Sequence, residues 1–90
     1  MLRIEYKNLF QKDLARAKKR GKDLEKLKEV IRWLAEDRAL PAKFRDHMLV
    51  GNYKHRRECH IEPNWLLIYK KEADTLIFER TGTHSDLFRC

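Results

Sequence analysis

The sequence predicts an α+β domain in which an antiparallel sheet of about four strands carries an N-terminal helical hairpin on one face. Two changes of pattern predict this class: apolar residues first alternate with charged ones, then recur at helical spacing, and after Pro41 return to strand-like runs. Three consecutive strands on short turns favour antiparallel pairing with the helices on one face. We therefore expect one domain over residues 1–90, in the order strand, helix, helix, strand, strand, strand and a short C-terminal helical turn.

The N-terminal half contains the first strand and both helices. Residues 2–7 alternate apolar and charged side chains, as in a strand buried on one face. Asn8 and Gln11 have the spacing of a capping box, Gly21 suits a helix end, and Asp23 can cap the second helix. The apolar residues that recur at helical spacing are Phe10, Leu14 and Ala17 in the first helix and Leu27, Val30, Ile31 and Leu34 in the second.

The C-terminal half begins with an expected loop at residues 38–52, which contains Asp46, His47 and Gly51. Residues 54–61 form the next strand, in which alternate side chains face opposite ways. The two sets are Glu58 and His60 on one face and Cys59 and Ile61 on the other.

Two more strands and a helical turn complete the chain. The apolar run Trp65–Tyr69 predicts a central strand buried on both faces, preceded by a tight turn at residues 62–65. A turn at residues 72–74 leads into a strand at residues 75–80, which Gly82 ends. We expect Ser85 to cap a final helical turn that carries Leu87 and Phe88.

The charge and the cysteines limit the class of protein. Twenty-one Lys and Arg against 14 Asp and Glu give a formal charge of +7, which attracts a nucleic acid or an acidic protein partner. A merely solubilising surface is the alternative explanation. Cys59 and Cys90 match no zinc spacing and no disulfide framework, and no signal-peptide core or membrane-spanning run is present. We expect a cytoplasmic protein without a membrane partner.

The histidines suggest proton-transfer chemistry, since imidazole titrates near neutrality and can both remove and deliver protons. Four of them, His47, His55, His60 and His84, lie in the C-terminal half. Cleavage of RNA without a metal needs a base for the ribose 2′-OH, a cation for the phosphorane and an acid for the departing 5′-oxygen. Arg80 could supply the cation, because its planar guanidinium matches phosphate oxygens.

Each of these residues also has a structural explanation. His47 could be an ordinary surface residue, and His60 could be satisfied by Glu58. Arg80 could pair with Glu79 or Glu62. The aromatic residues Trp65 and Phe88 are more often core residues than platforms for RNA bases. A zinc site is discounted because the spacings match no known pattern and Cys59 points to the other strand face.

Three segments of the C-terminal half resemble the YafQ branch of the RelE-type toxins. In order they are Phe44–His47 (FRDH), Arg57–Tyr69 (RECHIEPNWLLIY) and Phe78–Phe88 (FERTGTHSDLF). The resemblance implies a RelE-like fold and a ribosome-dependent, metal-independent endoribonuclease that cleaves mRNA in the A site and needs no cofactor. The implied catalytic residues are His47, His60, Asn64, Arg80 and His84, and the implied substrate-binding residues are Trp65 and Phe88.

The resemblance also implies partners. These are the mRNA, the ribosome with its 16S rRNA, a cognate acidic antitoxin, and operator DNA only through the antitoxin complex. Among the histidines, His84 is expected to be the general acid, and His60 and His47 the base or phosphate-contacting partners. A non-enzymatic module that binds RNA or the ribosome, or acts as a corepressor with the antitoxin, is the alternative.

The sequence departs from the family at one site position, where an Asp is replaced by Asn64. An amide keeps one acceptor oxygen but cannot take up a proton or carry charge near neutral pH. Either the natural enzyme relies on its histidines alone, or Asn64 attenuates a lethal activity. We favour attenuation.

Overall fold

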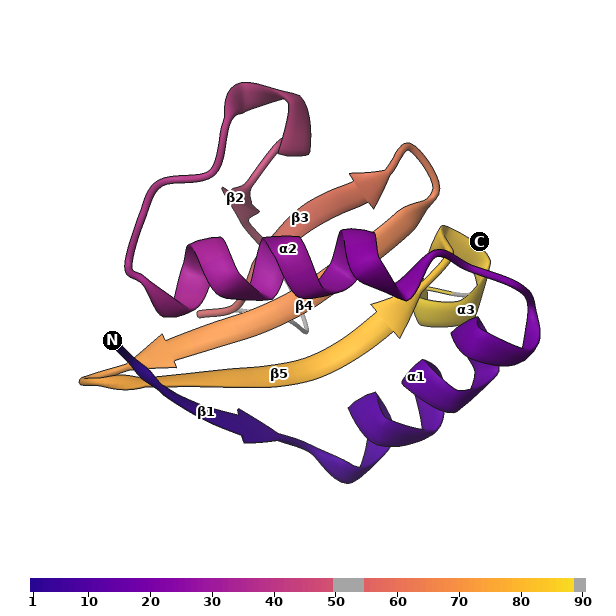
Figure 1. Ribbon diagram of the computed structural model, residues 1–90, viewed down its shortest axis with the longest axis horizontal. Coiled ribbons are helices and arrows are strands. Elements are labelled where there is room, and N and C mark those ends of the chain that lie inside the picture. Colours follow the sequence, from indigo (N-terminus) through magenta and orange to yellow (C-terminus); the bar gives the residue numbers. More distant parts are fainter. Residues whose placement is uncertain (50–54, 89–90) are drawn as a thin grey trace.

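The computed structural model describes residues 1–49 and 55–88 of the chain. Its elements, in order, are β1 (Arg3–Tyr6), α1 (Asn8–Lys19), α2 (Leu24–Ala35), the 3₁₀ helix η1 (Ala42–Phe44), β2 (His47–Met48), β3 (Arg57–Glu62), β4 (Trp65–Glu72), β5 (Thr75–Gly82) and α3 (His84–Phe88). The strands form one sheet in the order β1-β5-β4-β3-β2. Figure 1 shows α2 crossing one face of this sheet, α1 beside β5, and α3 at the far end of β5. The α+β class predicted from the sequence is confirmed.

The sheet differs from the prediction in direction and in strand number. β1 pairs with β5 in parallel, with Ile4 opposite Leu76, so the sheet is mixed and not purely antiparallel. Short turns fix the direction of β3, β4 and β5, but β1 is separated from β5 by both helices and no turn constrains it. The sheet also has one strand more than predicted. This strand, β2, lies inside the expected loop and pairs only His47 with Glu58 and Met48 with Arg57. Residues 50–52 of that loop, and residue 54 of the expected strand 54–61, lie outside the described residues.

The strand ends follow local turn chemistry. Glu62 pairs with Trp65, and Glu72 pairs with Thr75, so both expected turns are two residues long. β5 extends to Gly82, which is therefore its last residue. β1 lies at the edge of the sheet, and it is more exposed than the predicted half-buried strand, with Tyr6 44% exposed.

Of the caps predicted for the first two helices, one agrees with the structure. The Asp23 carboxylate accepts a hydrogen bond from the backbone N–H of Glu25 at 3.0 Å and so caps α2 as expected. Asn8, by contrast, is the first residue of α1, and its predicted capping box with Gln11 is wrong. Gln11 instead donates from Nε2 to the carbonyl of Tyr6. Gly21 ends the first helix in the left-handed conformation, with φ of 80°.

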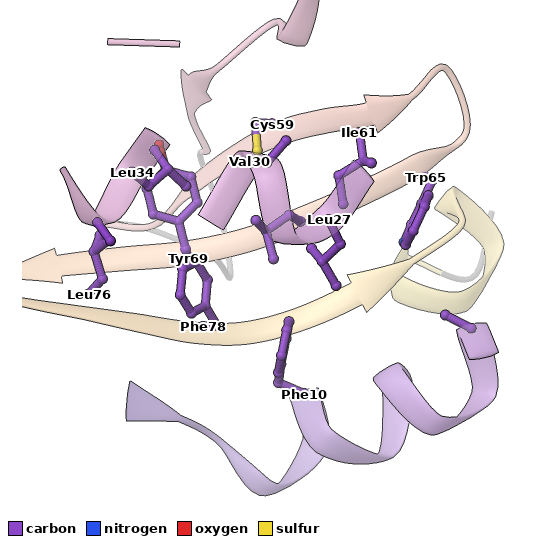
Figure 2. Close-up of a cluster of buried hydrophobic side chains, with 13 residues drawn as sticks. Phe10, Leu27, Val30, Leu34, Cys59, Ile61, Trp65, Tyr69, Leu76 and Phe78 are labelled. Carbon is purple, nitrogen blue, oxygen red and sulfur yellow. The ribbon is translucent and has the colours of Figure 1, made fainter. Parts of the chain in front are cut away.

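Hydrophobic clusters lie on both faces of β4, as its apolar run predicts. On one face α2 contributes Leu27, Val30 and Leu34 to a core with Cys59 and Tyr69 (Figure 2). On the other face Leu66 and Ile68 pack with Leu87 of α3. The second cluster is smaller, and Leu49 and Phe88 pack against it.

Within the described part of the chain, we find no helix that has both the length and the apolar character needed to cross a bilayer.

Candidate active site

Three histidines from separate segments converge on the face of the sheet opposite α2. His47 lies in β2, His60 in β3 and His84 at the start of α3. The ring centroids of His47 and His60 are 6.3 Å apart, and those of His60 and His84 are 5.9 Å apart. His60 is paired with Leu66 of the smaller cluster, and directly paired residues of antiparallel strands share a face. The fold therefore places the three imidazoles together, with His60 next to each of the other two.

His55 lies apart from the other three histidines, before the strand that carries His60. It precedes β3 with a left-handed backbone, φ 69°, whereas His60 is near the end of β3 that turns into β4. The fourth histidine is thus placed at the opposite end of this strand.

The buried carboxylate of Glu58 lies between two of the imidazoles. Its Oε2 atom is 3.0 Å from Nε2 of His47 and 3.6 Å from Nε2 of His60. The other ring nitrogen of His47, Nδ1, is 2.7 Å from the carbonyl oxygen of Arg45. A carbonyl and an ionised carboxylate can only accept hydrogen bonds. Nδ1 of His47 therefore carries a proton, and Nε2 is the ring nitrogen that faces the Glu58 carboxyl group.

His60 is held more loosely than His47. Its Nδ1 is 3.4 Å from the carbonyl oxygen of Pro63, and its Nε2 distance to Glu58 is longer than a strong hydrogen bond. The ring therefore has no short bond that occupies either nitrogen among the described contacts, and it can exchange a proton with a ligand.

Asn64 fixes the tautomer of His84. Its Oδ1 atom accepts the backbone N–H of His84 at 3.0 Å, and this bond identifies the atom as the oxygen, because a backbone N–H only donates. The same oxygen is 2.7 Å from Nδ1 of His84. Nδ1 must therefore carry a proton, and Nε2 is the nitrogen that can accept or release one.

A network of charges anchors α3 and hence His84. Asp86 accepts the backbone N–H of Thr83 at 2.9 Å, and Thr83 Oγ1 accepts the backbone N–H of Asp86 at 3.1 Å. This reciprocal pair shows that Thr83, and not the expected Ser85, caps the helix, because only Thr83 precedes its first turn. Arg20 donates to both Asp86 oxygens, at 2.7 and 3.2 Å, and this hydrogen bonding lowers the pKa of Asp86.

Gly82 allows α3 to pack this closely. A Cβ atom at Gly82 would lie 2.9 Å from Oδ2 of Asp86, nearer than real Cβ contacts. Only glycine therefore permits the present contact between the end of β5 and the capping carboxylate.

Asp46 anchors the segment that carries His47. The Tyr69 hydroxyl donates to Oδ1 of Asp46 at 2.6 Å, and Arg57 donates to both carboxylate oxygens at 3.3 Å. Burial, followed by this hydrogen bond, raises the pKa of Tyr69, so the phenol stays protonated and remains a donor. Two strands of the sheet thus hold the residue before His47 in place.

Arg80 shares the face of the histidines but pairs with α1. Glu58, Ile68 and Arg80 are partners across β3, β4 and β5, so their side chains form one row. Because two strand spacings separate them, the backbones at Arg80 and Glu58 are roughly 10 Å apart. Its guanidinium donates to Asp13 at 2.7 and 3.1 Å.

The alternative prediction that Arg80 pairs with Glu79 or Glu62 is wrong, because Arg80 pairs with Asp13 and other cations pair with those two carboxylates. Arg56 donates to Glu79, and Lys22 and Lys26 donate to Glu62.

The two aromatic residues expected to bind substrate differ in position. Trp65 is 1% exposed in the larger core, and its Nε1 donates to Thr81 Oγ1 at 2.9 Å. Its ring offers no surface to a base, so the structure places Trp65 in the core and corrects this expectation. Phe88 is partly exposed, and its ring centroid is 6.5 Å from that of His84.

The sequence singled out most of the residues gathered here but gave Glu58 a minor role. Its signal was the i, i+2 spacing to His60, which puts both on one strand face. The bridge to His47 needs the short strand β2, which no sequence pattern predicted.

Two other features are relevant to a chemical role, the Cys59 thiol and any group of side chains that could bind a metal ion. Burial raises the pKa of the Cys59 thiol, and the residue faces the larger core. Among residues 1–49 and 55–88, no three His, Cys, Asp or Glu side chains are grouped so as to hold a metal ion.

The chain is similar to known bacterial toxins over almost its whole length. Residues 2–89 match a family described as the bacterial toxin of type II toxin-antitoxin system, YafQ. The mRNA interferase toxin YafQ of Escherichia coli K12 is 48% identical over 86 residues, which cover 94% of each chain.

Solved structures agree with this match. A copper-bound mutant toxin from Helicobacter pylori is 43% identical, with a TM-score of 0.93 over 98% of this chain and 100% of that one. YafQ in its complex with DinJ from E. coli is 46% identical, with a TM-score of 0.91 over 98% of this chain and 99% of that one. The chain therefore belongs to the YafQ family of bacterial type II toxins.

Proposed function

We propose that this chain is an endoribonuclease toxin that cleaves mRNA in the ribosomal A site without a metal ion. The observation that carries the proposal is the row of three imidazoles, His47, His60 and His84, with neighbouring centroids 6.3 and 5.9 Å apart. The E. coli relative is named an mRNA interferase, which supports the same activity here. Ribosome dependence and a cytoplasmic location follow from the family resemblance.

The hydrogen bonds support a different role for each histidine. His60 is the general base that takes the 2′-OH proton, because neither ring nitrogen is held by a short bond. The 2′-oxygen then attacks the phosphorus, and the bond to the 5′-oxygen breaks. His84 protonates this leaving oxygen from Nε2, since its Nδ1 is occupied by Asn64. General acid–base catalysis of this kind contributes about 10²- to 10⁴-fold.

Two cations stabilise the phosphorane in this proposal. His47, in its protonated form, contacts a phosphate oxygen through Nε2, the nitrogen that faces Glu58, because its Nδ1 is held by the Arg45 carbonyl. Arg80 supplies the second cation from the same face of the sheet. Its pairing with Asp13 holds the guanidinium in a defined position. Phe88, beside His84, contacts the base of the bound nucleotide.

Asn64 attenuates the enzyme in this account. The amide orients the His84 ring, but it supplies no negative charge to favour the protonated form that an acid needs. An Asp at this position would make the same two bonds and add that charge.

The partners follow from charge and from the relatives. A solved complex contains E. coli YafQ with DinJ. We propose that a cognate acidic antitoxin neutralises this chain, and that the chain contacts operator DNA only through that complex. The charge of +7 favours both the antitoxin and 16S rRNA.

The proposal is tested by expressing the chain with and without its antitoxin and mapping mRNA 5′ ends. New ends within codons, present only when the antitoxin is absent, are expected. Growth arrest without new ends would favour the alternative, a non-enzymatic module that binds RNA or the ribosome.

A further inference from the structure

A pocket of about 400 Å³ opens directly beside the histidines. It lies between the N-terminal half of α2, the segment around η1 and the end of β3. Its lining includes Lys26, Lys43, Phe44, Arg45, His60 and Glu62. Its volume lies within the range of small-ligand sites, which is roughly 300–1,000 Å³.

The pocket is continuous with the candidate active site. His60 belongs to both, and the residue whose carbonyl holds His47, Arg45, also lines the pocket. β2 pairs with β3 only at Glu58 and Arg57, so the later part of β3 borders the pocket and not another strand. His60 is therefore shared by the candidate active site and the pocket, at the part of the β3 edge that β2 does not cover.

The charges of the pocket favour an anion. Lys43 and Arg45 are exposed, and within residues 1–49 and 55–88 neither side chain has a carboxylate partner. Of the two carboxylates in the lining, Glu62 is engaged by Lys26 at 2.9 Å and by Lys22 at 3.3 Å. Glu29 is the other carboxylate of the lining, so the two unpaired cations outnumber it.

The pocket also has an apolar part that suits a nucleobase. The Phe44 ring is partly exposed, with Lys43 Nζ 5.1 Å from its centroid, and Pro63 lies nearby in the lining. Bases of unpaired RNA bind by stacking on aromatic rings next to cations that contact the phosphate.

We propose that this pocket binds the RNA nucleotide next to the scissile phosphodiester. Its base lies against Phe44 and its phosphate faces Lys43 and Arg45. The inference rests on the proposed ribonuclease function and adds a second subsite to it. RNA is favoured over an acidic antitoxin segment because a strand whose phosphate lies at the histidines must continue into a neighbouring space, and His60 borders this one.

Photo-crosslinking on the ribosome tests the subsite. The A-site RNA carries a 2′-deoxy nucleotide at the attacking position, which blocks cleavage, and one 4-thiouridine at each of several positions on either side. The position adjacent to the scissile bond, on one side only, is expected to crosslink to residues 43–45. Crosslinks that all fall outside the pocket, or that reach it only from an antitoxin or from ribosomal RNA, would overturn the proposal.

A pair of double variants supplies the control. Lys43→Gln with Arg45→Gln is expected to reduce that crosslink about fivefold at a fixed toxin concentration, equivalent to a weakening of roughly 1 kcal/mol. Lys18→Gln with Lys19→Gln removes the same charge from exposed positions on α1 and should leave the crosslink unchanged. Equal losses in both would contradict a specific subsite.

Cleavage of the unmodified RNA by the unsubstituted chain is measured in parallel. Cleavage without crosslinks to the pocket would contradict the proposed subsite alone. Absence of cleavage would contradict both the proposed ribonuclease function and the subsite.

Discussion

Asn64 Oδ1 accepts two hydrogen bonds from His84, one from the backbone N–H at 3.0 Å and one from ring Nδ1 at 2.7 Å. The amide thus orients the ring, places its proton on Nδ1 and leaves Nε2 for chemistry. The amide is neutral, so it orients the imidazole without adding a negative charge that would favour its protonated form.

Asn64→Asp tests the effect of that charge. The carboxylate should keep both hydrogen bonds and stabilise the imidazolium form of His84, so that more of the enzyme holds the proton needed by the leaving oxygen. We expect cleavage of ribosome-bound mRNA to rise about tenfold, within the range of general acid catalysis. An unchanged rate would show that Asn64 does not attenuate the enzyme.

His84→Ala tests the general acid. The substitution removes the donor for the 5′-oxygen, and the cleavage rate should fall about 10²-fold or more, which should abolish growth arrest. Binding of the antitoxin should remain largely intact, which shows that the variant is folded. A variant that stays as toxic as the unsubstituted chain would contradict the role of His84.

Glu58→Gln tests the charge between His47 and His60. The amide has nearly the same shape, but it no longer stabilises His47 as a cation, so cleavage should fall about tenfold or more. Glu79→Gln is the matched control, since Glu79 also lies on a strand and pairs with Arg56. Equal cleavage rates for the two variants would argue that the Glu58 bridge has no catalytic consequence.

Asp86→Asn tests the anchor of α3 through the dependence of stability on pH. The hydrogen bond from Arg20 holds the pKa of Asp86 below its ordinary value of 3.8. A depressed pKa in the folded state adds stability that is complete above the ordinary value and is lost as the pH falls below it. At neutral pH the variant should lose about 1.5–3 kcal/mol, the range for hydrogen bonds to a charged group.

The difference between Asp86→Asn and the unsubstituted chain should shrink as the pH is lowered below about 4. Urea unfolding at several pH values measures it. Glu25→Gln serves as the control, because Glu25 is 79% exposed and its pair with Lys28 should contribute less than about 0.5 kcal/mol. A difference that stays constant with pH would rule out the charge of Asp86 as its source.

Local patterns predicted the elements that they encode directly. The stripe from Leu27 to Leu34 gave α2, Asp23 gave its cap, and the run Trp65–Tyr69 gave the strand that is buried on both faces. The parallel pairing of β1 with β5 and the short strand β2 depend on contacts between distant segments, so no local residue pattern could predict them. The capping box at Asn8 failed because a spacing of polar residues does not show which of them begins the helix.

The candidate site likewise has features that could be predicted from the sequence and features that could not. The family resemblance predicted that His47, His60 and His84 lie together, and in the structure their rings are close to one another. The partner of Arg80 could not be read from the sequence, because Asp13 lies 67 positions away on α1. Trp65 shows the converse, since an aromatic residue at a site position of the family is here a core residue bonded to Thr81.

The chemical ends of the cut mRNA test the central claim most directly. The purified chain is incubated with programmed ribosomes, and both fragments are analysed by mass spectrometry. Attack by the 2′-oxygen, with the imidazoles transferring the protons, predicts a 2′,3′-cyclic phosphate on the upstream fragment and a 5′-hydroxyl on the downstream one. A 5′-phosphate on the downstream fragment, or intact mRNA at saturating toxin, would contradict the account.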